Sequence, residues 1–493
     1  MPILNGFLGP TYPNRSINFQ SDRTINFFPE LSPSPDAKTV IALIGCPGTE
    51  LCLEVGTGAI RGTHVAAGYM FVVSGSYLYK VSTSSVVSAT LGTLATSSGR
   101  VQMKFNGLTS AGAGGNQLAI VDGVNLYIYN IYTGEFTTVS AATVGITPSA
   151  ITYLDGYFVI VDSTSMNARS STLYDGLTWP GLALSPISSS PENLVGCCSN
   201  SQELWFIKEF TTELWYDAGI ATSSGFPFMR VPGGVLNYGT TAPNSVVAGD
   251  NSVFMVGVSR NEDAGQFVGI VAFAGGVFTV ISPPSINYQI AQMADITDAF
   301  SFMFSMEGHT FLVVTFPTGD ATFIFDTTTK MWHERSSYAD NPYDYHMWNA
   351  NTYSYFNNTG YIGDMVNGNI YRLSSSLFTE NGDPIVSVRI TPSFFDNMEM
   401  DNIFIHKLEL DVETGVGDQA TSIGIDPQAE LSWSMDGGHT WSSEYPASMG
   451  KKGSYTINPT WRRLGAGRNR VFRVAMSAPV KRVVLGAYAE TSQ

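Results

Sequence analysis

The segment IRGTHVAAGYMFVVSGSYLYKVSTSSVVSATLGTL, Ile60 to Leu94, sets a pattern that recurs along the chain. Two short runs rich in aromatic and β-branched residues, Tyr69–Val73 and Tyr77–Val81, are separated by Ser74-Gly75-Ser76. Such runs of about five residues, bounded by Gly and Ser, are typical of antiparallel strands joined by tight turns. One small meander cannot bury both of its faces, so further copies must pack beside it.

Further copies follow downstream, and their spacing indicates the architecture. The second strand of each copy is expected to begin near residues 69, 117, 157, 203, 252, 309 and 358. Intervals of this size match the roughly 40–50 residues of a four-stranded propeller blade. The sequence therefore predicts an all-β protein in which residues 60–395 form a β-propeller, with six blades favoured and seven as the alternative. The seventh and weakest copy is either a junction or a blade that the N-terminal segment completes.

The two flanks lack this repeat. Residues 1–59 contain several prolines and no sustained periodicity, and they predict an extended N-terminal arm that lies over its own ring or over a neighbouring subunit. Residues 396–493 carry five strand-like runs, and in Phe404–Val412 apolar and polar residues alternate. Short alternating strands at this density predict a separate C-terminal β-sandwich-like domain.

The most specific short motif lies in this C-terminal domain. The run from Ser434 to Trp441, SMDGGHTW, matches the Asp-box pattern S-x-D-x-G-x-T-W. In such a turn the carboxylate accepts backbone N–H bonds, the glycines take positive φ and the tryptophan packs beneath. Sialidases carry several boxes on a propeller, whereas this chain has one box outside it, which favours a structural hairpin. The expected hairpin residues are Ser434, Asp436, Gly438, Thr440 and Trp441.

Composition and residue spacing argue against most catalytic chemistry. The net charge is −16, which argues against general adhesion to nucleic acid or to anionic membranes. The four cysteines and six histidines do not show the spacing of metal ligands. The longest apolar run, Phe267–Ile281, is shorter than the roughly 20 residues that a membrane-spanning helix needs. We therefore expect no enzymatic activity, no metal, no cofactor and no membrane insertion. A carbohydrate-binding or sialidase-like propeller protein remains the alternative function.

Three sequence features together resemble a known family. They are Cys46-Pro47-Gly48, the run Ile60-Arg61-Gly62 leading into GYMFVVSGSYLYKV, and the closing stretch SWSMDGGHTWS…TWRRLGAGRNRVFRVAMSAPVKRVVLGAYAE. This combination resembles the packaged-DNA stabilisation proteins, also called tail hub or nozzle proteins, of short-tailed bacteriophages (podoviruses). The matching motifs cover about a quarter of the chain.

The resemblance implies a structural virion protein of the phage tail, assembled in the host cytoplasm. It implies a sixfold ring below the portal and its adaptor that continues the DNA channel, helps retain the packaged genome and supports fibres, spikes or a needle-like plug. A channel through which duplex DNA passes must not bind the DNA tightly. We therefore expect a lumen lined by Asp, Glu, Ser, Thr and Asn. The basic residues expected at subunit or adaptor contacts are Arg462, Arg463, Arg468, Arg470 and Arg473.

Overall fold

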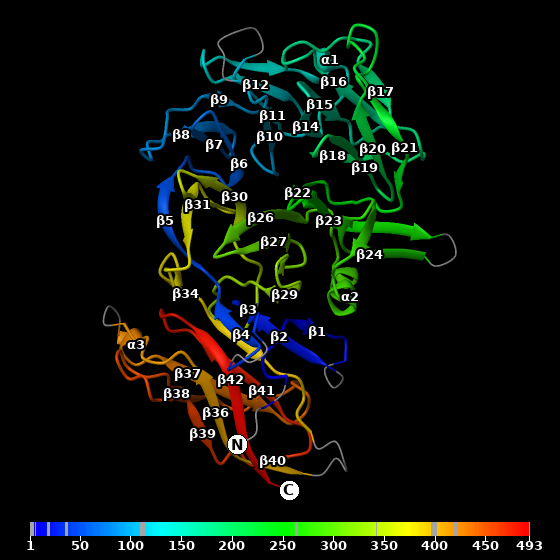
Figure 1. Ribbon diagram of the computed structural model, residues 1–493. Coiled ribbons are helices and arrows are strands. Elements are labelled where there is room, and N and C mark those ends of the chain that lie inside the picture. Colours follow the sequence, from blue (N-terminus) through cyan, green and yellow to red (C-terminus); the bar gives the residue numbers. More distant parts are fainter. Residues whose placement is uncertain are drawn as a thin grey trace.

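The computed structural model describes residues 4, 6–16, 20–34, 38–108, 115–261, 265–341, 343–395, 402–418 and 422–492. About half of these residues lie in strands, and groups of four strands pair as antiparallel meanders (Figure 1). The first strand of each meander contacts the first strand of the next, and the last such strand contacts the first one again. The meanders are therefore the blades of a closed β-propeller.

Each of the first five blades consists of four strands that are consecutive in the sequence. Their bounds are β6 (Ile60–Ala66), β7 (Tyr69–Ser74), β8 (Tyr77–Val81) and β9 (Gly92–Thr93); β10 (Gln102–Phe105), β11 (Gln117–Val121), β12 (Leu126–Asn130) and β13 (Phe136–Val139); β14 (Ala150–Leu154), β15 (Tyr157–Val161), β16 (Asn167–Ser170) and β17 (Leu184–Pro186); β18 (Leu194–Asn200), β19 (Glu203–Lys208), β20 (Thr212–Asp217) and β21 (Phe228–Leu236); and β22 (Val247–Gly249), β23 (Ser252–Asn261), β24 (Gly265–Ala274) and β25 (Val277–Val280).

The sixth and seventh blades belong to larger sheets. The sixth comprises β26 (Phe300–Met306), β27 (His309–Phe316), β28 (Ala321–Asp326) and β29 (Met331–Glu334). The seventh comprises β30 (Ala350–Phe356), β31 (Thr359–Asp364) and β32 (Asn369–Ser374), completed by β5 (Gly48–Glu54) from the N-terminal segment. The short hairpin of β33 (Thr379–Glu380) and β34 (Asp383–Pro384) continues this sheet beyond β5.

Seven blades replace the six that the sequence favours. The last blade supplies only three strands from its own part of the sequence, and β5 pairs antiparallel with β32 to make the fourth. Residues 1–59, expected as an extended arm, in fact carry five paired strands, β1 to β5. Of the two alternatives for the weak seventh copy, the structure has the blade completed by the N-terminal segment.

The C-terminal part is a sandwich of two sheets. One sheet has the order β3 (Phe27–Leu31), β4 (Ile41–Gly45), β42 (Val483–Ser492), β36 (Ile403–Val412) and β39 (Thr460–Arg462), with β40 (Ala466–Gly467) beside β36. The other has the order β2 (Ser21–Ile25), β35 (Ser387–Ile390), β41 (Val471–Met476), β37 (Gln428–Ser434) and β38 (Tyr445–Ser448), with β1 (Tyr12–Pro13) beside β2. The predicted all-β fold with a propeller and a C-terminal sandwich is confirmed.

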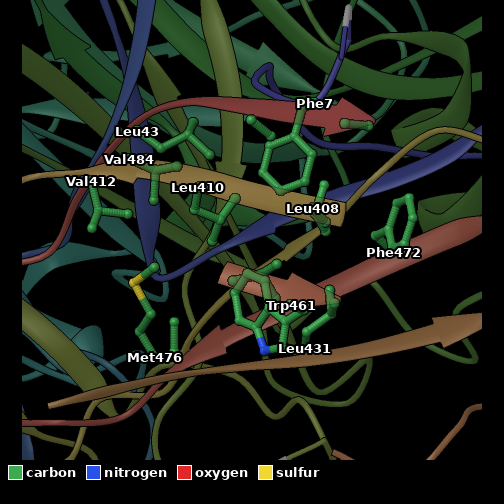
Figure 2. Packing of buried hydrophobic residues seen from close by; sticks show 14 of the residues in the cluster. Phe7, Leu43, Leu408, Leu410, Val412, Leu431, Trp461, Phe472, Met476 and Val484 are labelled. Atoms are coloured by element: carbon green, nitrogen blue, oxygen red, sulfur yellow. The ribbon is translucent and has the colours of Figure 1, made fainter. Parts of the chain in front are cut away.

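Both ends of the chain build the sandwich core. Figure 2 shows Phe7 and Leu43 of the N-terminal segment packed with Leu408, Trp461 and Val484. All five side chains are buried. Burial of large apolar side chains stabilises a fold by roughly 1.5–3 kcal/mol each, so the N-terminal segment is an integral part of this core.

One sheet runs continuously from the propeller into the sandwich. β29, the last strand of the sixth blade, pairs in parallel with β2, where Ile25 lies opposite Glu334. β2 in turn pairs antiparallel with β35, and β35 with β41. The sixth blade and the second sandwich sheet thus share one set of main-chain hydrogen bonds.

Helices are few and short among the described residues. They are α1 (Ala141–Val144), α2 (Pro284–Gln292), α3 (Ser422–Ile425) and the 3₁₀ turn η1 (Pro243–Ser245). None of the described helices is long and apolar enough to cross a membrane.

Candidate subunit interface and Asp-box hairpin

The Asp-box residues meet in one hairpin that follows β37. Asp436 Oδ1 accepts the Thr440 N–H at 2.9 Å, and Asp436 Oδ2 accepts the Thr440 hydroxyl at 2.6 Å. Ser434 Oγ accepts the Gly438 N–H at 2.7 Å and donates to Asp436 Oδ1 at 2.6 Å. Hydrogen bonds from Ser434 and then Thr440 hold the pKa of Asp436 well below its usual range. Its carboxylate therefore accepts turn hydrogen bonds and is not poised to donate a proton.

Trp441 connects this hairpin to the propeller side of the sandwich. The Arg473 guanidinium lies 4.5 Å from the centre of the Trp441 ring and 3.5 Å from the centre of the Tyr343 ring. Tyr343 lies in the segment between blades six and seven, so Arg473 is held between aromatic rings of the two domains. Arg473 Nε also donates to Ser432 Oγ at 2.9 Å. These contacts give the hairpin a structural role where the domains meet.

The five arginines expected at an interface divide into two groups. Arg470 and Arg473 are buried within the chain, and Arg470 Nη1 donates to the Leu464 carbonyl at 2.7 Å. Arg462, Arg463 and Arg468 are exposed. The exposed three lie on and beside β39 and β40, at the edge of the first sandwich sheet. We call them the basic edge.

Sequence reasoning missed the polar contacts that join the N-terminal segment to the rest of the molecule. Arg389 of β35 donates to the Phe7 carbonyl at 2.7 Å and to Thr24 Oγ1 at 2.7 Å, and it pairs with Asp22 at 3.1 Å. Arg23 forms an ion pair with Glu334 of the sixth blade. The partners lie hundreds of residues apart, so no local pattern could have revealed them.

The Ile60-Arg61-Gly62 motif also has a structural explanation. The Arg61 side chain, 2 % exposed, donates to the carbonyls of Gly75, Thr96, Ser98 and Gly99 at 2.6–2.8 Å. It therefore fixes the loop between the first two blades. A Cβ at Gly62 would lie 2.9 Å from the Val101 carbonyl oxygen, which accounts for the glycine.

The described residues contain no group of three or more His, Cys, Asp or Glu placed to hold a metal ion. Buried His333 has its pKa lowered to about 3 by burial and stays neutral. Burial likewise raises the pKa of the Cys197 and Cys198 thiols, that of Cys198 to about 12, so neither is a ready nucleophile.

Comparison with known families identifies the family of this chain. Residues 1–377 match a family described as "Bacteriophage P22 Gp10, beta-propeller", and residues 388–492 match "Bacteriophage P22 Gp10, beta-sandwich". The chain belongs to the bacteriophage P22 Gp10 family. Membership implies a tail nozzle and stabilisation protein located in the virion tail, and neither matched family is described as enzymatic.

Two solved structures show a weak similarity to this Gp10 family member. The N-terminal domain of Nup159 is 10% identical with a TM-score of 0.41, covering 72% of this chain and 99% of its own. The Neurospora crassa Pan2 WD40 domain is 6% identical with a TM-score of 0.41, covering 66% of this chain and 95% of its own. Neither likeness bears on function. No curated protein matches the sequence.

Proposed function

We propose that this Gp10 family member forms a ring, with six copies expected, below the portal and its adaptor in the phage tail. The ring continues the DNA channel, helps retain the packaged genome and carries fibre, spike or needle proteins. The observation that carries this proposal is the family match over both the propeller and the sandwich. The chain would assemble in the host cytoplasm before it joins the virion.

The shared sheet supports a mechanical role for the junction between propeller and sandwich. Main-chain hydrogen bonds run from β26 through β29 and β2 to β38. The Asp22–Arg389 ion pair and the Arg473 contacts add side-chain links in the same region. A propeller and a sandwich joined in this way move as one unit, which suits a wall that must withstand the pressure of packaged DNA.

The charge of the chain supports passage of DNA without tight binding. Each Lys or Arg contact with a phosphate adds affinity through counterion release. Six copies would carry six times −16, or −96. Because salt screens charges that are more than about 8–10 Å apart, the residues next to the phosphates determine how tightly the lumen binds duplex DNA. We propose a lumen lined by Asp, Glu, Ser, Thr and Asn.

The basic edge is our candidate for contact with the next subunit or the adaptor. Arg462, Arg463 and Arg468 are exposed in the stretch 401–493, whose basic and acidic residues balance, whereas residues 1–400 carry the whole net charge of −16. Opposite charges on two surfaces of one chain favour a head-to-tail contact, and such contacts generate a ring when the rotation between neighbouring subunits closes.

The test is the mass of the purified protein by native mass spectrometry. We expect a species at six times 53.2 kDa. Reversing the basic edge to Glu at all three positions should convert this species to monomer. The matched control reverses two exposed loop lysines, Lys451 and Lys452, and should leave the mass unchanged. A wild-type protein that stays monomeric at high concentration, alone and with the adaptor, contradicts the ring.

A further inference from the structure

Three large apolar side chains are exposed in one short loop of the third blade. The loop comprises residues 172–178, between β16 and β17, and its Leu173, Tyr174 and Leu177 are 49 %, 42 % and 42 % exposed. Single exposed apolar residues are common on soluble proteins, whereas neighbouring ones with a polar border are typical of interaction sites. This loop is therefore a candidate docking surface.

The loop is fixed by buried side chains beneath it. Gln117 of the second blade is buried, and its Nε2 donates to Asp175 Oδ1 at 2.9 Å while its Oε1 accepts the Gly176 N–H at 2.6 Å. Trp179 is buried as well, and its Nε1 donates to the Gly176 carbonyl at 2.8 Å. The backbone that carries the three exposed side chains is thus held in one arrangement. A preordered surface loses little conformational entropy when a partner covers it.

Two carboxylates border the exposed apolar side chains. The Tyr174 N–H donates to the Gly156 carbonyl at 2.6 Å, which places the loop beside Asp155 in the turn between β14 and β15. Partial burial and then the charge of Asp217 raise the pKa of Asp155, so these two carboxylates repel each other. The only basic residue between positions 151 and 186 is Arg169, which is buried. A cation from another molecule would relieve this repulsion.

We call this surface the blade-3 patch; it consists of Leu173, Tyr174, Leu177, Asp155 and Asp217. The basic edge of the sandwich has the complementary composition, since its three arginines are exposed and exposed apolar side chains lie beside the same strands.

Two apolar residues accompany the basic edge. Phe404 of β36 lies opposite Ala466 of β40 and is 48 % exposed. Met435 is 55 % exposed, and its Cγ would lie 3.8 Å from a Cβ at Gly467 of β40. Figure 1 shows β39 and β40 at the opposite end of the molecule from β16 and β17. The two surfaces therefore cannot meet within one chain.

We propose that the basic edge of one copy docks on the blade-3 patch of the next copy. Its arginines pair with the two carboxylates of the patch, and Phe404 and Met435 pack against the apolar side chains. A guanidinium also stacks well on the face of a tyrosine such as Tyr174. Because the two surfaces differ, the contact is head-to-tail. This inference rests on the proposed ring and names the two surfaces that form it.

The test is a charge swap, with assembly of the full-length chain measured by analytical ultracentrifugation at 0.15 M salt. Asp155→Lys together with Asp217→Lys reverses the patch, and Glu at all three arginines reverses the basic edge. Either reversal alone should abolish assembly, because it sets like charges against each other. Both reversals in one chain should restore the assembled species, since the charges are then complementary again.

Matched controls separate the patch from general effects of charge and polarity. Asp250→Lys changes an exposed residue in the corresponding turn of the fifth blade, where φ is 50°, close to the 47° of Asp155. It should leave assembly unchanged. Leu177→Ser keeps the charge and should weaken association about tenfold, because less apolar surface is buried. Val366→Ser alters a side chain that is 76 % exposed on the seventh blade and should have no effect.

Each outcome decides the proposal. Dissociation by reversal of the basic edge, with unchanged assembly in the patch reversal and in Leu177→Ser, leaves the ring standing and overturns this contact. Loss of assembly in both reversals without recovery in the combination overturns it too. A wild type that stays monomeric, alone and with the adaptor, contradicts the ring itself. If the double patch reversal does not fold, Asp155→Lys alone and Leu177→Ser, which change exposed side chains, give the answer.

Discussion

His309 Nε2 lies 2.9 Å from Glu30 Oε2, so an imidazole of the sixth blade contacts a carboxylate of the sandwich directly. Its other nitrogen, Nδ1, lies 2.7 Å from Asp326 Oδ2 of the same blade. Both ring nitrogens thus face carboxylates, and only the protonated imidazolium can donate a hydrogen bond from each. Glu30 belongs to β3, so this contact bridges the two domains.

The first prediction concerns pH. Burial alone would lower the pKa of His309, but the hydrogen bonds and charges of Asp326 and Glu30 outweigh it and raise the pKa. A raised folded-state pKa gives stability that is full below the unfolded value near 6.5 and is lost as pH rises through the folded value. The Tm difference between wild type and His309→Gln should therefore be largest in mild acid and shrink at alkaline pH.

Thermal unfolding of both proteins from pH 5 to 9 measures this difference. The variant also leaves the Asp326 carboxylate buried without its imidazole partner, at a cost of about 1–3 kcal/mol. His346→Gln is the matched control, because His346 is exposed and contacts Asp320 within the propeller side of the molecule. A pH-independent Tm difference between wild type and His309→Gln would show that the charge on His309 contributes nothing to the junction.

The second prediction concerns closure of the propeller. Leu53 of β5 is 8 % exposed and packs with Ile60 and Ile370. Replacing a buried Leu by Ala costs about 2–5 kcal/mol, so Leu53→Ala should lower the free energy of unfolding by that amount. Leu51 lies on the same strand but is 37 % exposed, and Leu51→Ala should have little effect. Urea unfolding distinguishes the two variants, and equal losses would contradict the role of β5.

The third prediction concerns the Asp-box hairpin. Asp436→Ala removes the acceptor of the Thr440 N–H, so hydrogen exchange of the Thr440 amide should become faster. Because the pKa of Asp436 is lowered in the folded state, the protection factor of the Thr440 amide, which corrects for the intrinsic pH dependence of exchange, should fall in the wild type only when pH falls below the usual range of an aspartate. Asp418→Ala is a control outside the hairpin. Loss of a sugar-cleaving activity with unchanged exchange would restore the sialidase-like alternative.

The fourth prediction concerns DNA. The assembled protein should bind duplex DNA weakly at 0.15 M salt, because the chain is strongly acidic. The rival arrangement is a basic collar that holds the DNA end after packaging. Titration of binding against salt separates the two. Tight binding with a steep salt dependence, abolished by reversing Arg462, Arg463 and Arg468 to Glu, would establish the collar.

The repeat could be predicted from the sequence because each blade is a local unit. The second strands were expected near 69, 117, 157, 203, 252, 309 and 358, and β7, β11, β15, β19, β23, β27 and β31 begin at 69, 117, 157, 203, 252, 309 and 359. The pattern of apolar and polar residues along a strand indicates which neighbouring residues are buried, so it locates such meanders well. It gives no information on which distant strand completes a sheet, so the sequence allows two alternatives for the seventh copy, and only the structure shows β5 paired with β32.

The candidate interface was harder to predict, for two physical reasons. A β-bulge between Ile405 and Lys407 changes which residues of β36 face the core, so His406 is exposed while Leu408 is buried. Strict alternation predicts that residues two apart, such as these two, share one face. Arginine is usually exposed, yet Arg470 is buried beneath its own loop and donates to the Leu464 carbonyl. Sequence alone could not separate it from exposed Arg468.

The pairing of β5 with β32 has a consequence for synthesis on the ribosome. Glu50 and Arg372, which meet across these strands, are 322 residues apart. β5 leaves the ribosome early and must wait, with an unpaired strand edge, until β32 has followed, and β4 must wait for β42 near the end of the chain. A chain that ends before β32 can therefore close neither its propeller nor its sandwich, and one that ends before β42 cannot complete its sandwich. Only finished chains would present complete surfaces to one another, so the fold itself excludes truncated copies from the tail.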